Sequence, residues 1–149
     1  MKIKLIFLLM IVSISALAQE KTVIHDRQAR AMLLEKHKLS LQWISWDYFG
    51  TATVMERMRV MRLKAEQRGR GRGDTDFVSV EGMIVSVDKD QFVLEGMIVT
   101  KVSHINGGKP CERRGEFTFK ITGKRKYWRM QEMDNPCDEA TDYVDLYFR

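Results

Sequence analysis

The chain has 149 residues, with 25 Lys and Arg against 20 Asp and Glu, and 44% of its residues are hydrophobic. Two of the lysines lie in an apolar leader, so the rest of the chain carries 23 basic and 20 acidic side chains, a formal charge of +3. So small an excess is a poor argument for a nucleic-acid or membrane partner. The length indicates one domain, large enough to bury a core.

The first residues, MKIKLIFLLMIVSISALAQE, have the order of a secretory signal peptide. Two lysines precede an apolar run over 5–17, and Ala-Leu-Ala stands directly before Gln19. The run is shorter than the roughly 20 residues that span a bilayer. We therefore expect a signal peptide at 1–18 and a single β-rich domain at 19–149, with an uncleaved anchor as the alternative. Cleavage leaves no transmembrane segment and places the protein in the periplasm or the medium.

Residues 22–39, TVIHDRQARAMLLEKHKL, are rich in helix formers and predict one N-terminal helix. From Leu41 the pattern is β-rich, with aromatic and β-branched residues on both sides of Gly50. The segment MERMRVMRLKAE at 55–66 fits a strand or a helix, and its alternation favours the strand. The arginine-glycine run at 68–74 has alternating glycines and predicts a loop.

The pentapeptide EGMIV occurs at 81–85 and again at 95–99, with the polar turn DKDQ between the two copies. This arrangement predicts a β-hairpin. Glycines at matching heights in the two strands suggest a sheet that curls toward closure. The predicted register pairs Val87 with Phe92, Val85 with Leu94, Gly82 with Met97 and Met83 with Gly96.

A second hairpin is predicted over 115–133, and TDYVDLYFR at 141–149 alternates like a half-buried final strand. No long crossover helix separates the strands, so antiparallel order is expected. Such a chain must hide its strand edges. We therefore predict a mainly β fold, an antiparallel meander that closes into a small barrel or barrel-like sheet, calycin-like or OB-like, with one N-terminal helix.

Cys111 and Cys137 both follow the leader, and an even pair in an exported chain predicts a disulfide. The bridge would stabilise the fold by about 3–4 kcal/mol. Neither cysteine lies in a Cys-x-x-Cys motif, and His104 alone is a poor third metal ligand. We expect no metal and no cofactor.

Two separate sets of candidate binding residues lie in the first half of the chain, one of arginines and one of tryptophans. Arg68, Arg70 and Arg72 could contact phosphates or an acidic polysaccharide, or form a solvated loop. Trp43 and Trp46 belong to the densest aromatic cluster of the chain. They would pack in the core or line a barrel mouth that holds a small apolar ligand or a sugar.

The second group lies in KRKYWR at 124–129, where cations alternate with two rings. On a strand Tyr127 and Trp128 point to opposite faces, so one ring at most can stack on a ligand. Arg125 or Arg129 would then clamp an anion. The alternative places one ring in the core and the basic side chains in solvent.

Five acidic residues crowd the C-terminal region, and their spacing matches no calcium-binding loop. We interpret them as an acidic loop that balances the neighbouring basic strand. The residues are Asp134, Asp138, Glu139, Asp142 and Asp145.

Catalysis has little support, because the chain has no Gly-x-Ser-x-Gly, His-Glu-x-x-His or phosphate-binding loop. Glu81 and Glu95 could act as an acid and a base. The predicted register places them near opposite ends of their hairpin, which argues against this pairing.

The stretches RKYWRMQEM, CDEATDYVDLYF, LSLQWISWDYFG and VEGMIV resemble a family of small exported bacterial β-rich proteins of unassigned function. The resemblance implies a bacterial envelope or secreted setting and assigns no residue a role. We therefore expect an exported, non-enzymatic binding module of the cell envelope, acting on an envelope protein, a glycan or a small ligand. An OB-like module for nucleic acid or another polyanion is the first alternative, and a weak hydrolase is the second.

Overall fold

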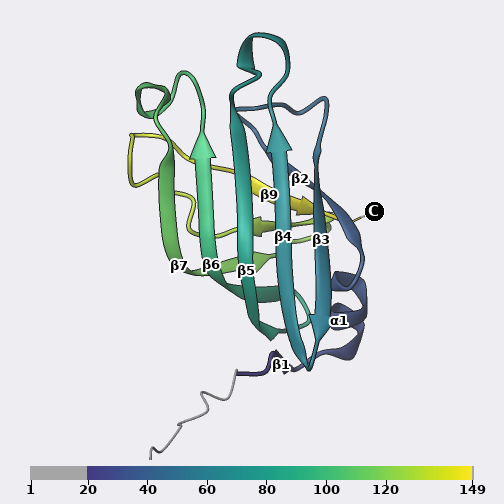
Figure 1. Ribbon diagram of the computed structural model, residues 1–149. Coiled ribbons are helices and arrows are strands. Elements are labelled where there is room, and N and C mark those ends of the chain that lie inside the picture. The colour runs from purple at the N-terminus through teal and green to yellow at the C-terminus, as the bar shows by residue number, and fades with distance from the viewer. Residues whose placement is uncertain (1–19, 149) are drawn as a thin grey trace, which may run out of the picture.

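The computed structural model describes residues 20–148, and the predicted signal peptide at 1–18 lies outside this range. Within the described residues the chain forms one short α-helix and nine strands (Figure 1). The elements in chain order are β1 Val23–Ile24, α1 Arg27–Leu33, β2 Lys36–Leu41, β3 Gly50–Arg57, β4 Val60–Arg68, β5 Phe77–Val87, β6 Gln91–Lys101, β7 Cys111–Lys120, β8 Tyr127–Met130 and β9 Val144–Tyr147, with 3-10 turns at Gly71–Gly73 and Asn106–Gly108.

Strands β2 to β9 form a closed antiparallel barrel. Each of these strands pairs with its neighbour in the sequence, and β9 pairs with β2 to close the sheet. The closing pairs include Leu39 with Leu146 and Leu41 with Val144. The predicted mainly β meander barrel is confirmed. Its up-and-down order is the calycin-like arrangement, since an OB-fold is a five-stranded Greek-key barrel.

Helix α1 is shorter than the predicted range 22–39. It begins after Asp26, whose carboxylate accepts a hydrogen bond from the Ala29 N–H at 2.7 Å. The helix prediction fails at both ends, because Val23–Ile24 pairs in parallel with β5 and Lys36–Leu41 forms β2. Helix propensity is a weak preference, and the pairing that closes the barrel overrides it here. No helix among residues 20–148 is long and apolar enough to cross a membrane.

The segment 55–66 is the β3–β4 hairpin, which confirms the strand interpretation. Met58 and Arg59 form its two-residue turn, with φ of 52° and 65°. Hairpin turns with two positive φ angles normally carry Asn-Gly, because a Cβ atom is disfavoured in this left-handed conformation. Met58 is 83% exposed at the tip, so nothing packs over its side chain.

The β5–β6 hairpin follows the predicted register only near its turn, where Val87 lies opposite Phe92. A β-bulge at Val85 then shifts the pairing by one residue, so Gly82 lies opposite Gly96. A bulge of this kind inserts one unpaired residue and increases the local bend. The predicted pairs Gly82 with Met97, Met83 with Gly96 and Val85 with Leu94 are therefore wrong.

Gly82, Gly96 and Gly115 lie side by side on β5, β6 and β7. A Cβ atom on Gly82 would lie 2.3 Å from the Glu95 carbonyl oxygen, and one on Gly96 would lie 2.1 Å from the Glu81 carbonyl oxygen. Only glycine permits so close an approach between neighbouring strands. The row marks a sharp bend of the sheet, in agreement with the curling inferred from the repeated glycines.

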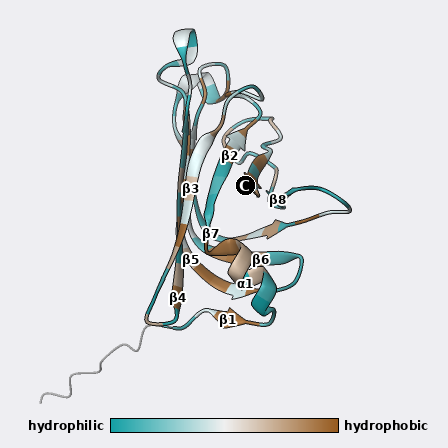
Figure 2. Ribbon diagram, turned by 90° about the vertical axis from the view of Figure 1, so that its right-hand side faces the viewer, coloured by the Kyte–Doolittle hydropathy of each residue, from teal (hydrophilic) through white to brown (hydrophobic). Residues whose placement is uncertain are grey.

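The inside of the barrel is filled by apolar side chains. Phe92 and Phe119 stack with ring centroids 5.0 Å apart, and Trp128 packs edge-on against Phe92 at 5.9 Å. All three are at most 1% exposed. Hydrophobic and hydrophilic residues alternate along the strands (Figure 2), as expected when one face of a sheet is buried. A binding site therefore has to be sought on the outer face or at the ends of the barrel.

The β3–β4 turn leads to a first prediction. Replacing Met58 with Asn places a residue that tolerates positive φ in the turn and removes no buried contact. The variant Met58→Asn should raise the free energy of unfolding by roughly 1 kcal/mol, measured by urea denaturation. The matched control is Met55→Asn on the exposed face of β3, which should not stabilise the fold because Asn is a poor strand residue. Destabilisation by Met58→Asn would contradict the turn geometry.

Candidate functional site

Four connections gather at one end of the barrel, which we call the loop end. They follow β2, β4, β6 and β8 and lie at the top of Figure 1. Because successive strands run in opposite directions, alternate connections meet at the same end of the barrel. The loop end consists of residues 42–49, 69–76, 102–110 and 131–143.

A hollow of about 280 Å³ lies at the loop end. It collects a ring or a cation from each of the first three connections. Two of the predicted arginines and one predicted tryptophan are among its lining residues. The side chains that give it its character are Trp43, Tyr48, Arg70, Arg72 and His104.

A second hollow of about 450 Å³ shares Trp43 with the first and includes Trp46, which is 52% exposed. Arg68 lines neither hollow. Its guanidinium pairs with Glu66 at 2.5 Å and lies 5.6 Å from the centroid of the Phe77 ring. The fold thus brings four predicted residues together and leaves Arg68 aside; the four are Trp43, Trp46, Arg70 and Arg72.

The first hollow combines flat rings with guanidinium groups. The Arg70 guanidinium lies 4.3 Å from the centroid of the Tyr48 ring, and Trp43 meets His104 edge-on at 5.8 Å. Stacking occupies the face of a guanidinium and leaves its N–H edge available. Among the described residues neither Arg70 nor Arg72 has a carboxylate partner within 4 Å. Rings beside such donors suit a ligand with a flat apolar face and anionic groups, such as an acidic sugar.

Trp43 is anchored by a buried polar network. Its indole N–H donates to Oδ1 of Asp142 at 3.1 Å, and the Asn135 side-chain amide donates to Oδ2 of the same carboxylate at 3.1 Å. Asp142 is 1% exposed. Burial raises the pKa of Asp142, while the hydrogen bonds from Trp43 and Asn135 and the charge of Arg113 lower it. The Trp43 ring is therefore held in one orientation beside both hollows.

The predicted disulfide joins Cys111 at the start of β7 to Cys137 in the last connection, with the Cα atoms 6.0 Å apart. Cys137 also donates its backbone N–H to the side-chain oxygen of Asn135 at 2.8 Å. The bridge thus fixes the segment that supplies the partners of Trp43. Asp142 and Asp145 are buried, and Asp145 lies in β9 and not in a loop. Its ion pair with Arg129 nevertheless balances a cation of the neighbouring basic strand, as interpreted from the sequence.

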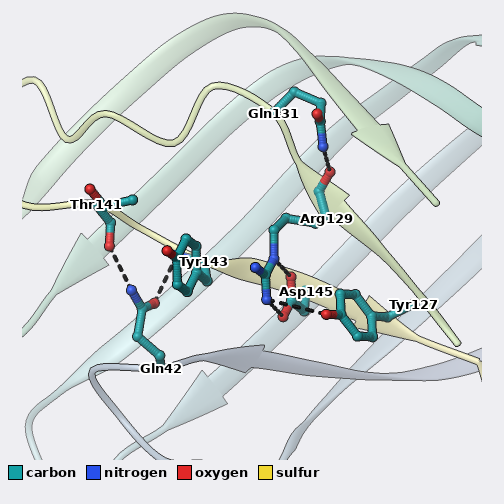
Figure 3. A network of polar contacts seen from close by, with 7 residues as sticks. All are labelled: Gln42, Tyr127, Arg129, Gln131, Thr141, Tyr143 and Asp145. Atoms are coloured by element: carbon teal, nitrogen blue, oxygen red, sulfur yellow. Dashed lines mark hydrogen bonds and ion pairs between the residues drawn. The ribbon is translucent and has the colours of Figure 1, made fainter. Parts of the chain in front are cut away.

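Two further contacts tie the connections of the loop end together. Oδ1 of Asp76 accepts hydrogen bonds from the backbone N–H and the hydroxyl of Ser103, at 3.0 and 2.6 Å. The Gln42 side chain donates to the Thr141 carbonyl and accepts the Tyr143 backbone N–H at 2.8 Å (Figure 3). The arginine-glycine segment and the first aromatic segment are therefore held in place by specific partners.

The second predicted group lies on the outer face of β8 and β9, beside the closing strand pair (Figure 3). Arg129 donates from Nε and Nη2 to the two carboxylate oxygens of Asp145, each at 2.7 Å. Its guanidinium lies 4.1 Å from the Tyr143 ring centroid and 5.2 Å from that of Tyr127. The hydrogen bond to Asp145 is the main reason why the pKa of Arg129 is raised. This cluster holds β8 to β9, and the Nε and Nη2 donors of Arg129 bind Asp145 and not a ligand.

The other two members of that group have opposite environments. Trp128 is 1% exposed and packs against Phe92 and Phe148 in the core. It is therefore out of reach of a ligand at the surface, as the alternation of the strand demands. Arg125 is exposed and lies 5.6 Å from the Tyr127 ring.

Glu81 and Glu95 lie closer together than the predicted register implied. With the bulge in place, Glu81 lies opposite Met97 and Glu95 opposite Met83, on the same outer face of the sheet. Both carboxylates line one hollow. Their placement at opposite ends of the hairpin was wrong, and the arginines that share their hollow are Arg62 and Arg114.

Three residues of the loop end were not predicted as part of a site. Tyr48 belongs to the same aromatic cluster as Trp43, so that cluster was a usable signal. His104 and Asp142 come much later in the chain, and no motif marks them. They reach the site only because the barrel closes.

Comparison with known proteins gives one family and one curated relative. The model of the PM1083 family matches residues 21–148. A Pasteurella multocida (strain Pm70) protein described as uncharacterized protein PM1083 is 43% identical over 136 residues, covering 91% of this chain and 86% of the relative. No solved structure matches the chain.

The buried Asp142 carboxyl leads to a second prediction. Its folded-state pKa lies above the ordinary value of 3.8, so the folded protein holds this proton more tightly than the unfolded chain does. The stability that results is fully present below about pH 3.8 and is lost as the pH rises through the folded pKa. The free energy of unfolding of the native protein should therefore fall relative to that of Asp142→Asn as the pH rises from acid to neutral.

The measurement is urea denaturation of both proteins over this pH range. Asp90→Asn, in the exposed β5–β6 turn, is the matched control for the loss of a carboxyl group that is not buried. The free energies of unfolding of the native protein and Asp142→Asn are then compared. If their difference stays constant, or grows in favour of the native protein as the pH rises, burial is not the main influence on the pKa of Asp142.

Proposed function

The chain belongs to the PM1083 family, and from this premise we propose that it is an exported, non-catalytic binding module of the bacterial cell envelope. The ligand binds at the loop end, around Trp43. The ligand class that fits best is a glycan with carboxylate or sulfate groups.

One observation carries the proposal: the convergence of two rings and two arginines from distant segments around adjacent hollows. Trp46 offers a half-exposed ring, and Arg70 and Arg72 offer donors that no carboxylate takes up within the described chain. Burying a ring against the flat face of a sugar while pairing its acidic groups with arginine uses both features. Trp43 supplies a second ring whose orientation is fixed by Asp142.

Two further features support the envelope location. The leader has the order of a secretory signal peptide. The disulfide between Cys111 and Cys137 is typical of proteins that mature in an oxidising compartment. Periplasm and medium both satisfy this requirement.

The third prediction concerns binding itself. Oligosaccharides of polygalacturonate, used as acidic-sugar probes, should bind saturably and change the tryptophan fluorescence of the protein, because Trp43 and Trp46 line the hollows. Trp46→Ala should weaken binding on the order of tenfold, as truncation of a central aromatic contact does. Arg70→Gln with Arg72→Gln should weaken it further and reduce its salt dependence.

Arg68→Gln is the matched control, because Arg68 lies in the same arginine-glycine segment, pairs with Glu66 and lines neither hollow. Its affinity should equal that of the native protein. Single-stranded DNA and heparin serve as competitors. If both competitors displace the sugar in proportion to their charge, and Arg68, Arg70 and Arg72 contribute equally to affinity, the protein is a general polyanion binder and the glycan proposal fails. If no acidic probe binds at moderate salt, glycan binding and general polyanion binding are both ruled out.

A further inference from the structure

The end of the barrel opposite the loop end carries a separate cationic surface, which we call the N-terminal end. It consists of residues 20–30 and the tip of the β3–β4 hairpin, residues 56–59. Both lie at the bottom of Figure 1, next to β1. Residues of both segments line a hollow of about 610 Å³.

The hollow is strongly basic. Its lining includes four cations and one carboxylate, that of Glu56, which pairs with Arg30. Asp26 is engaged at the start of α1, where it accepts the Ala29 N–H. Within the described chain no carboxylate lies within 4 Å of the three remaining cations, which are Lys21, Arg27 and Arg59.

An apolar side chain projects beside these cations. Met58 is 83% exposed at the hairpin tip, between the exposed Arg57 and Arg59. Its φ of 52° is unfavourable for a residue with a Cβ atom. Val23, which lines the hollow, is 50% exposed. Exposed apolar groups ringed by Lys and Arg are suited to an anionic lipid surface, where the cations meet headgroups and the apolar group reaches the acyl boundary.

The path of the chain points to the same surface. Thr22 donates its backbone N–H to the Arg59 carbonyl at 3.0 Å, and its hydroxyl donates to the Ile84 carbonyl at 2.7 Å. The same hydroxyl accepts the Met61 backbone N–H. Thr22 is thereby fixed next to the hairpin tip. The apolar leader, which the sequence predicts to engage the membrane during export, ends only a few residues before Thr22 in the sequence.

We propose that the N-terminal end docks the barrel on an anionic phospholipid surface. The cations over the hollow bind the headgroups, and Met58 inserts among the upper acyl chains. The loop end then faces away from the bilayer. This proposal is independent of the ligand assigned to the loop end, because the two surfaces share no residue.

The fourth prediction uses the chain that begins at Gln19, so that the leader contributes nothing to binding. The core, the disulfide and the β2–β9 pairing all lie within residues 20–148, so this chain contains the whole barrel. It should cosediment with vesicles rich in phosphatidylglycerol and remain in solution with vesicles of phosphatidylcholine alone. Replacing Lys21, Arg27 and Arg59 with Gln should weaken binding on the order of 100-fold, since each cation near the surface contributes comparably.

The matched control removes three exposed cations from other faces, Lys64, Lys109 and Arg114, by the same change to Gln. Its vesicle affinity should stay close to that of the native protein. Met58→Asn separates docking from folding, because it should weaken vesicle binding about threefold to tenfold while stabilising the fold. The proposal would be overturned if the control triple variant lost as much vesicle affinity as the Lys21, Arg27 and Arg59 variant. It would also be overturned if the protein bound phosphatidylcholine vesicles as well as phosphatidylglycerol vesicles, or bound neither.

Discussion

The antiparallel pairing of β2 with β9 is the contact on which the rest of the structure depends. It joins Leu39 to Leu146 and Leu41 to Val144, and it leaves the barrel without a free edge. The pairing also brings the segment after β2 close to the segment before β9, where Trp43 donates its indole N–H to the Asp142 carboxylate. Closure of the sheet therefore also places the aromatic residues of the loop end. On the outer face beside the pairing, the Arg129–Asp145 ion pair holds β8 to β9.

The barrel separates two surfaces of different chemistry. At the loop end, rings and arginines surround hollows whose walls are tied together by a disulfide and buried carboxylates. At the N-terminal end, cations and an exposed methionine lie close to Thr22, near the start of the described residues. Because strands cross from one end to the other, a barrel of this kind can hold a ligand away from a surface to which it is docked. The packed interior makes it a rigid spacer.

The sequence predicted the features that depend on local pattern. Alternation and turn residues gave the antiparallel meander, and cysteine count gave the disulfide. Predictions from the sequence were wrong where pairing between distant segments determines the structure. Lys36–Leu41 has good helix formers before it, yet it becomes β2 because the closing strand needs a partner. No residue pattern near Val85 predicts the bulge, and the bulge shifts every β5–β6 pair beyond it by one residue. Of the residues that meet at the loop end, the sequence pointed to Trp43, Trp46, Arg70 and Arg72, whereas no motif pointed to Asp142.

The most direct test of this account is native-state amide hydrogen exchange by NMR on the chain that begins at Gln19. If β2 and β9 close the barrel, the amides that bond across Leu39–Leu146 and Leu41–Val144 should exchange only through global unfolding, as slowly as those of β5 and β6. Exchange at these positions as fast as at an open strand edge would contradict closure. The placement of Trp43 beside Asp142, and with it the proposed binding site, would then lose its basis.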